Sequence, residues 1–305
     1  MGKIKQTLRP SPTALLNPRI DPAFKGIFTQ GTEQSELALK SFLSAMIGRN
    51  VVEVTLQPNE PPVDTITQKQ MSFDVSVKFD DNELADIEMQ GQKQDYDLGF
   101  RSEGQVARLL NSTIKRGDNW QLSKVYQITI INFEYDKDDK SVLSWYTMKN
   151  SGGHTLGDRL NIIYLDLHKI KKLISKPKDE LKEYEKWGLF FAYEDDKEKT
   201  EYLREIVESE KGIMAAHDTI KHMSENEENW AWQLSYETAI LDRNTIIHNA
   251  TERGKDEGLK QGMAQQKIED AINLYKNGVS LELIAKSLKM TVEEVEKIVK
   301  KAEKV

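Results

Sequence analysis

The chain has 305 residues, of which 38% are hydrophobic and 30% are charged, a composition typical of a soluble globular protein with a highly charged surface. Its formal net charge of −7 excludes nucleic-acid binding through a general positive field, so any contact with DNA needs a local basic surface. The absence of cysteine excludes disulfides, thiolate catalysis and cysteine-based zinc sites, and it is typical of proteins from a reducing cytoplasm.

The length exceeds that of an average domain, which predicts a main domain with an appendage. We expect the main domain to span residues 1–254, with a motif-bearing core at about 20–170 and a helical part at about 177–254. A charged linker and a small helical module are expected over 255–305, where Gly254, Gly258 and Gly262 recur within a highly charged stretch.

The basic N-terminal segment has no continuous apolar core, so a signal peptide is not expected. No apolar run approaches the roughly 20 residues of a membrane span. These features predict a cytoplasmic protein without a membrane partner.

The first elements are predicted by their capping residues. Asp21 followed by Pro22 is typical of a helix N-cap and first helical position, so a short helix is expected over Asp21–Phe28. A second helix is expected over about Ser35–Ile47, ended by Gly48. Val51–Gln57 is predicted to form a strand.

A hairpin is the most informative element of the sequence. Met71–Phe79 alternates between apolar and polar residues, and Glu83–Gln90 does the same after a three-residue loop in which Asn82 tolerates the left-handed conformation. Apolar side chains should then face one another across the hairpin, which fixes its register. The predicted pairs are Phe79 with Glu83, Val77 with Ala85, Val75 with Ile87, and Phe73 with Met89.

The outward face of this hairpin should bring carboxylates together. The register places Asp74 opposite Glu88, with Gln90 beside them and Asp86 one step away. At a Cβ separation of about 5 Å, two like charges repel by about 3 kcal/mol at an effective dielectric of 20, more than an ordinary cross-strand pair contributes. A bound cation, with Mg²⁺ or Mn²⁺ favoured by oxygen ligands, or a proton retained on one carboxyl group would relieve this repulsion. The alternative is a pair of solvated carboxylates held apart by rotamers or strand twist.

After the hairpin, a helix is expected over about Arg101–Arg116. Arg101, Arg108 and Lys115 recur every seven residues on one of its faces, which could contact phosphates or be an ordinary solvated face.

The rest of the main domain is predicted to continue as strands and then helices. Strands are expected over Val125–Phe133, Ser141–Met148 and Ile162–Leu167, the first of them central and covered on both faces. From about Pro177 the chain should be mostly helical, with the packing anchors Trp187, Trp230 and Trp232.

Three helices with intervening turns are expected at the C-terminus. They span about Gln265–Tyr275, Leu281–Leu288 and a last segment after Thr291. Because the charges of this module are close to balanced, we favour an interaction module that forms a homodimer over a reader of DNA sequence.

Several of these segments, in order and spacing, resemble the recombination-promoting nuclease/transposase family of bacteria, which belongs to the PD-(D/E)XK superfamily. The resemblance spans roughly Ile20–Phe133. It is carried by Asp21-Pro-Ala-Phe-Lys25, Phe73-Asp74-Val75, Ile87-Glu88-Met89-Gln90, and Arg101 with the helix and strand that follow it. It implies an α/β fold, a restriction-endonuclease-like mixed sheet flanked by helices with a helical C-terminal extension.

The resemblance also implies roles for individual residues. Asp74 and Glu88 match the metal-binding carboxylates, Gln90 occupies the position of the motif lysine, and Asp21 matches the first acidic position of the family pattern. Asp21 as a simple helix cap is the alternative. The implied cofactor is Mg²⁺ or Mn²⁺ and the implied substrate is DNA.

The DNA-binding residues are expected to be Arg101, Gln105, Arg108 and Lys115, although family members often have tyrosine where this chain has Gln105. An amide at Gln90 cannot supply the positive charge of a lysine, and Lys25, Lys78 and Lys115 are the candidates to replace it.

These features predict a cytoplasmic, metal-dependent DNA endonuclease associated with recombination or mobile elements. One alternative is a catalytically weak or inactive DNA-binding or regulatory protein on a degenerate nuclease fold. Another is a transposase partner that works only with other mobile-element factors.

Overall fold

The computed structural model describes residues 7–60, 72–114, 117, 119 and 121–302. Its strands are β1 (Val54–Leu56), β2 (Val75–Phe79), β3 (Glu83–Gln90), β4 (Val125–Ile131), β5 (Leu143–Thr147) and β6 (Leu160–Asp166). The helices are α1 (Asp21–Thr29), α2 (Glu33–Ile47), α3 (Leu98–Ser112), α4 (Leu167–Ile170), α5 (Glu183–Tyr193), α6 (Thr200–Ser209), α7 (Lys211–Met223), α8 (Glu227–Lys276), α9 (Leu281–Leu288) and α10 (Val292–Ala302). Two short 3₁₀ turns occupy Lys171–Leu173 and Lys178–Glu180.

The strands form one mixed sheet in the order β1-β2-β3-β4-β6-β5. The central pairs β3–β4 and β4–β6 are parallel, and the outer pairs are antiparallel. Strand β4 is buried along its whole length, as expected of a strand covered on both faces. The predicted α/β class, a mixed sheet flanked by helices, is confirmed.

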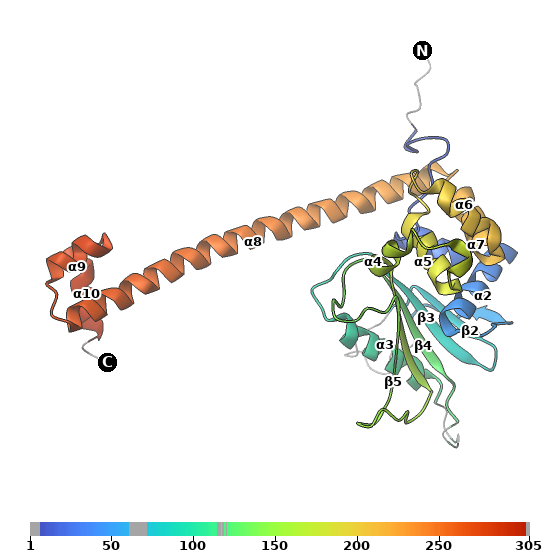
Figure 1. Cartoon of the computed structure of the whole chain (residues 1–305), viewed down its shortest axis with the longest axis horizontal. Helices are drawn as coiled ribbons and strands as arrows, with labels where there is room; N and C mark the ends of the chain where they lie inside the picture. Colours follow the sequence, from blue (N-terminus) through green and yellow to red (C-terminus); the bar gives the residue numbers. More distant parts are fainter. Residues whose placement is uncertain (1–6, 61–71, 115–116, 118, 120, 303–305) are drawn as a thin grey trace, which may run out of the picture. The chain divides into compact units, whose positions relative to one another are not determined.

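Helices lie on both faces of the sheet (Figure 1), and each face carries one of two apolar clusters. The larger cluster joins residues of α1, α2, α5 and α7 to the face that carries Val75, Ala85 and Ile128. The smaller cluster joins Val106 of α3 and its neighbours to the opposite face. Because α3 lies over that opposite face, polar residues there are enclosed between a helix and the sheet.

The hairpin has the predicted register over most of its length. The observed pairs are Phe79 with Glu83, Val77 with Ala85, and Val75 with Ile87. Asn82 is left-handed with a φ of 62°. Pairing ends at Val75, however, because the backbone bends at Asp74. The bend turns Phe73 into the cluster beneath α3, so the prediction that Phe73 faces Met89 is wrong. Met71 lies outside the described residues.

Helix ends differ from the prediction at two places near the site. In α1 the N-cap is Ile20, which makes no side-chain cap hydrogen bond, so Asp21 lies in the first turn and is not the cap. Helix α3 begins at Leu98, where the Asp97 side chain accepts from the amide of Phe100, and ends at Ser112. The carboxylate of Asp21 is therefore available for contacts outside its own helix end.

The tryptophans expected to anchor the helical part separate into two groups. Trp187 and Trp230 are buried, with 1% and 5% of their surface exposed. Trp232 is 53% exposed, so its predicted role as a packing anchor is wrong. Trp232 follows Trp230 by two residues in the same helix, and side chains at that spacing point to different faces of a helix.

The chain divides into two compact units, Met1–Ser235 and Tyr236–Val305. Helix α8 has 50 residues. It includes Gly254, Gly258 and Gly262, which were expected to belong to a charged linker before the helical module. The last two helices pack with the end of α8 around Ala271, Ile284 and Val295, as the predicted helical module requires. Within the described residues, no helix is both long enough and apolar enough to cross a membrane.

Candidate active site

The polar residues of β3 that were predicted to face outward from the hairpin lie on the face of the sheet that α3 covers. Only 2% of the Glu88 side chain is exposed, whereas 21% of the Asp74 side chain is exposed. Gln90 and Asp86 are buried as well. The prediction of an outward face is therefore wrong for these residues, and the alternative of two solvated carboxylates does not hold for Glu88.

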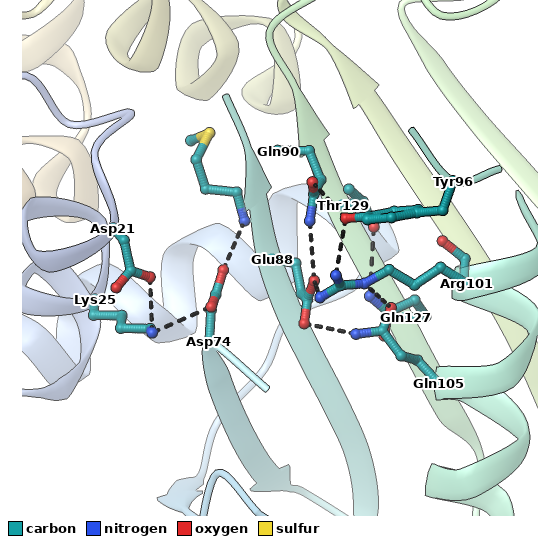
Figure 2. A network of polar contacts seen from close by, with 12 residues as sticks. Asp21, Lys25, Asp74, Glu88, Gln90, Tyr96, Arg101, Gln105, Gln127 and Thr129 are labelled. Atoms are coloured by element: carbon teal, nitrogen blue, oxygen red, sulfur yellow. Dashed lines mark hydrogen bonds and ion pairs between the residues drawn. The ribbon is translucent and has the colours of Figure 1, made fainter. Parts of the chain in front are cut away.

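The bend directly before the start of β2 places Asp74 against β3 (Figure 2). Its Oδ2 accepts a hydrogen bond of 3.2 Å from the backbone amide of Met89, the residue after Glu88. Its Oδ1 lies 3.2 Å from Nζ of Lys25 on α1. Asp74 is thus held between the first helix and the strand that carries Glu88.

Donors surround both carboxylate oxygens of Glu88 (Figure 2). Oε2 accepts from Nη2 of Arg101 at 2.8 Å and from Nε2 of Gln90 at 3.2 Å. Oε1 accepts from Nε2 of Gln105 at 2.7 Å. Arg101 and Gln105, predicted to bind DNA, therefore contact the candidate metal ligand in this structure.

Tyr96 connects the surface to this network and was not singled out from the sequence. Its hydroxyl accepts a hydrogen bond of 2.9 Å from Nη1 of Arg101, and the guanidinium lies over the Tyr96 ring. The same hydroxyl donates to Oε1 of Gln90 at 3.4 Å. No spacing signal in the sequence pointed to Tyr96, because it lies in the irregular segment between β3 and α3.

The electrostatics of the site favour a bound cation. Burial, followed by the charge of Asp74, raises the pKa of Glu88 to about 7, against the opposing effects of Arg101, Gln105 and Gln90. Burial also raises the pKa of Asp74, although Lys25 opposes the shift. The cationic side chains thus compensate only part of the negative charge at these two carboxylates.

Asp86 adds a third carboxyl group to the same interior. It is fully buried, and neither of its oxygens has a hydrogen-bond partner among the described residues; the same is true of Oε1 of Gln127, its neighbour on β4. Burial and the charges of Glu88 and Asp74 raise the pKa of Asp86 well above its ordinary value. An additional positive charge near Asp74 and Glu88 would lower the electrostatic free energy of the ionised forms of these two groups.

The donor set fits a hard divalent cation. Among the described residues, no group of three His, Cys, Asp or Glu side chains is arranged to hold a metal ion. Asp74 and Glu88 offer two carboxylates. Mg²⁺ is commonly bound by one or two protein carboxylates, while water molecules and substrate phosphate are its other ligands. These two residues would hold the ion.

The remaining predicted residues take different positions. Arg108 is half-buried on α3, and Lys115 lies outside the described residues. Asp21 contacts Lys25 at 2.7 Å. The four-residue spacing of Asp21 and Lys25 in a helix was the signal that could have identified this pair from the sequence.

Comparison with known proteins identifies the family of the chain. The family model of the PD-(D/E)XK nuclease family transposase matches residues 18–250, which include all six strands and both candidate metal ligands. No curated protein and no solved structure matches the chain. The match covers more than half of the chain, together with the motifs that carry the resemblance. The chain therefore belongs to the PD-(D/E)XK nuclease family of transposases.

Proposed function

We propose that this protein is a metal-dependent DNA endonuclease of the bacterial cytoplasm, associated with recombination or mobile elements. The observation that carries the proposal is the buried Glu88 beside Asp74, within the residues that match the family model. Burial and the charge of Asp74 raise the pKa of Glu88 to about 7. The cofactor is Mg²⁺ or Mn²⁺, and the reaction is hydrolysis of phosphodiester bonds.

The chemistry is divided among the residues already described. When bound, the divalent ion polarises the phosphate and lowers the pKa of a water molecule. Asp74 and Glu88 hold the ion, and the amide groups of Gln90 and Gln105 orient the Glu88 oxygens. The side chain of Arg101 is 35% exposed, and we expect its guanidinium to release Glu88 and bind a phosphate of the substrate.

Plasmid cleavage tests the proposal directly. The purified full chain is incubated with supercoiled plasmid in Mg²⁺, in Mn²⁺ and in EDTA, beside the Asp74→Ala variant. We expect nicked or linear product only for the wild type with metal. No cleavage by the wild type in either metal would contradict endonuclease activity.

A second candidate is a DNA-binding or regulatory protein on a degenerate nuclease fold. Gln90 in the position of the motif lysine favours it, because an amide supplies no positive charge to the transition state. This candidate predicts DNA binding without cleavage in the plasmid assay. The third candidate, a transposase partner, predicts cleavage only when other mobile-element factors are added.

Arg108, on α3, and Lys115, which lies outside the described residues, test the proposed contact with the DNA backbone. Replacing both with alanine should weaken binding to all DNA sequences and lower the slope of log affinity against log salt by about 1 for each phosphate that is no longer neutralised. Fluorescence anisotropy at several salt concentrations measures this slope. Arg204→Ala, an exposed arginine on α6, is the matched control. An unaltered slope in the double variant would leave these residues as a solvated face.

The C-terminal module is proposed to mediate homodimerisation. Large apolar side chains are exposed after Lys255, among them Leu259, Met263 and Leu283. A chain ending at about Lys255 should keep a folded, metal-binding core but change its assembly or its DNA affinity. Light scattering and DNA titration measure both properties. An unchanged mass together with an unchanged affinity would refute a role for this module in assembly.

A further inference from the structure

Lys25 links two carboxylates that come from different elements (Figure 2). Its Nζ lies 2.7 Å from Oδ1 of Asp21, one turn earlier in α1, and 3.2 Å from Oδ1 of Asp74. The ammonium group thus occupies the space between these two acids and contacts the Asp74 oxygen that the Met89 amide does not bind.

Two of the three lysines considered from the sequence, Lys25 and Lys78, belong to the described residues, and Lys115 lies outside them. Lys78 lies on β2, four residues after Asp74, where it pairs with Leu84 of β3. Of these two lysines, Lys25 is the one that contacts Asp74.

We infer that Lys25 acts as a built-in cation in the second metal position, so that the site takes one divalent ion, held by Asp74 and Glu88. This inference rests on the proposed function. Gln90 on β3 supplies no positive charge to the site. In this arrangement Lys25 on α1 supplies it.

The oxygens around Lys25 determine how many ions the site can hold. Two-metal sites hold ions about 3.5–4 Å apart, with ligands on both sides of the pair. At Asp74, the ligands for a second ion would be Oδ1 of Asp74 and the carboxylate of Asp21, and the ammonium of Lys25 contacts both. A covalently attached cation at these oxygens competes with a second divalent ion at every metal concentration.

Replacing Lys25 should be compatible with folding. The side chains of Lys25 and Asp21 are 30% and 41% exposed, and ion pairs with such exposure contribute little to stability. Methionine keeps most of the apolar stem of lysine while removing its charge. Lys25→Met therefore leaves Asp21 and Asp74 without their shared counter-ion and leaves the backbone of α1 unchanged.

Calorimetric titration of the full chain with Mn²⁺ tests the inference, with electron paramagnetic resonance as a second measurement. The wild type should bind one Mn²⁺ per chain and give the signal of an isolated ion. Lys25→Met should bind two, with a spin-coupled signal, because Asp74 would then lie between both ions. Adding Asp21→Asn to Lys25→Met should return the stoichiometry to one.

Lys78→Met is the matched control and should still bind one ion. Two ions in the wild type, or one ion in a folded Lys25→Met variant, would overturn the inference and leave the endonuclease proposal standing. A wild type that binds no Mn²⁺ would refute the proposed function, and the inference with it. Lys25→Gln, a second neutral substitution, is used if Lys25→Met shows altered circular dichroism in EDTA.

Discussion

Glu88→Gln and Asp74→Asn should each abolish metal-dependent cleavage while leaving the metal-free protein at least as stable as the wild type. Each substitution removes one negative charge and nearly preserves the shape of the side chain. Burial already disfavours the charged form of both residues, so removing that charge relieves an unfavourable contribution to the free energy of folding. The same substitution removes one of the two carboxylates proposed to hold the ion.

The expected loss of cleavage is large. Residues that only support metal ligands typically change metal affinity or activity by about 10–100-fold, so loss of a ligand should reduce cleavage by more than roughly 100-fold. The wild type should be stabilised by about 2.7 kcal/mol at a free metal concentration of about 100 times Kd, because the ion binds only the folded state. Neither variant should show this stabilisation.

Thermal unfolding in EDTA and in increasing Mg²⁺ or Mn²⁺, followed by the plasmid assay, measures both effects. Asp158→Asn is a suitable control, because this exposed aspartate pairs with Lys124 away from the site. A wild type without a metal-dependent shift would favour the degenerate fold. Strong destabilisation of both variants in EDTA would indicate a structural role for the two carboxylates.

Local and short-range features of this fold could be predicted from the sequence. The hairpin register followed from alternation and from a loop in which Asn82 adopts a left-handed conformation, and both are properties of adjacent residues. That register brought Asp74 and Glu88 to the same part of the sheet. The resemblance to the nuclease family, which is shown by the family match, added the metal and the DNA as expectations.

The features that could not be predicted depend on contacts between distant segments. Alternation cannot show that the backbone bends at Asp74, nor that α3 encloses the polar face of the hairpin and buries Glu88. Periodicity placed Arg101 on a helix but could not indicate that it pairs with Glu88. The contact of Lys25 with Asp74 joins positions 49 residues apart and depends on how α1 packs beside β2.

The pH dependence of stability gives a further measure of the Glu88 environment. The pKa of Glu88 in the folded protein is about 7, compared with an ordinary value of 4.5. Because the folded state binds this proton more tightly than the unfolded state, the stability contributed by protonated Glu88 is fully present below about pH 4.5. It is lost as the pH rises through about 7. A pKa difference of this size corresponds to about 3 kcal/mol at most.

The expected result is that the metal-free wild type loses stability between about pH 4.5 and 7 more steeply than Glu88→Gln, which lacks this titration. Asp74 and His217, which also have a raised pKa, remain in both proteins. Because the charge of Glu88 contributes to the raised pKa of Asp86, the difference between the two curves measures Glu88 together with its effect on Asp86. Saturating Mg²⁺ should reduce the slope of the wild type, because the ion favours the ionised carboxylate. Urea unfolding at several pH values, with and without metal, gives these curves. Parallel curves for the two proteins in EDTA would show that Glu88 titrates normally and that its surroundings do not require a cation.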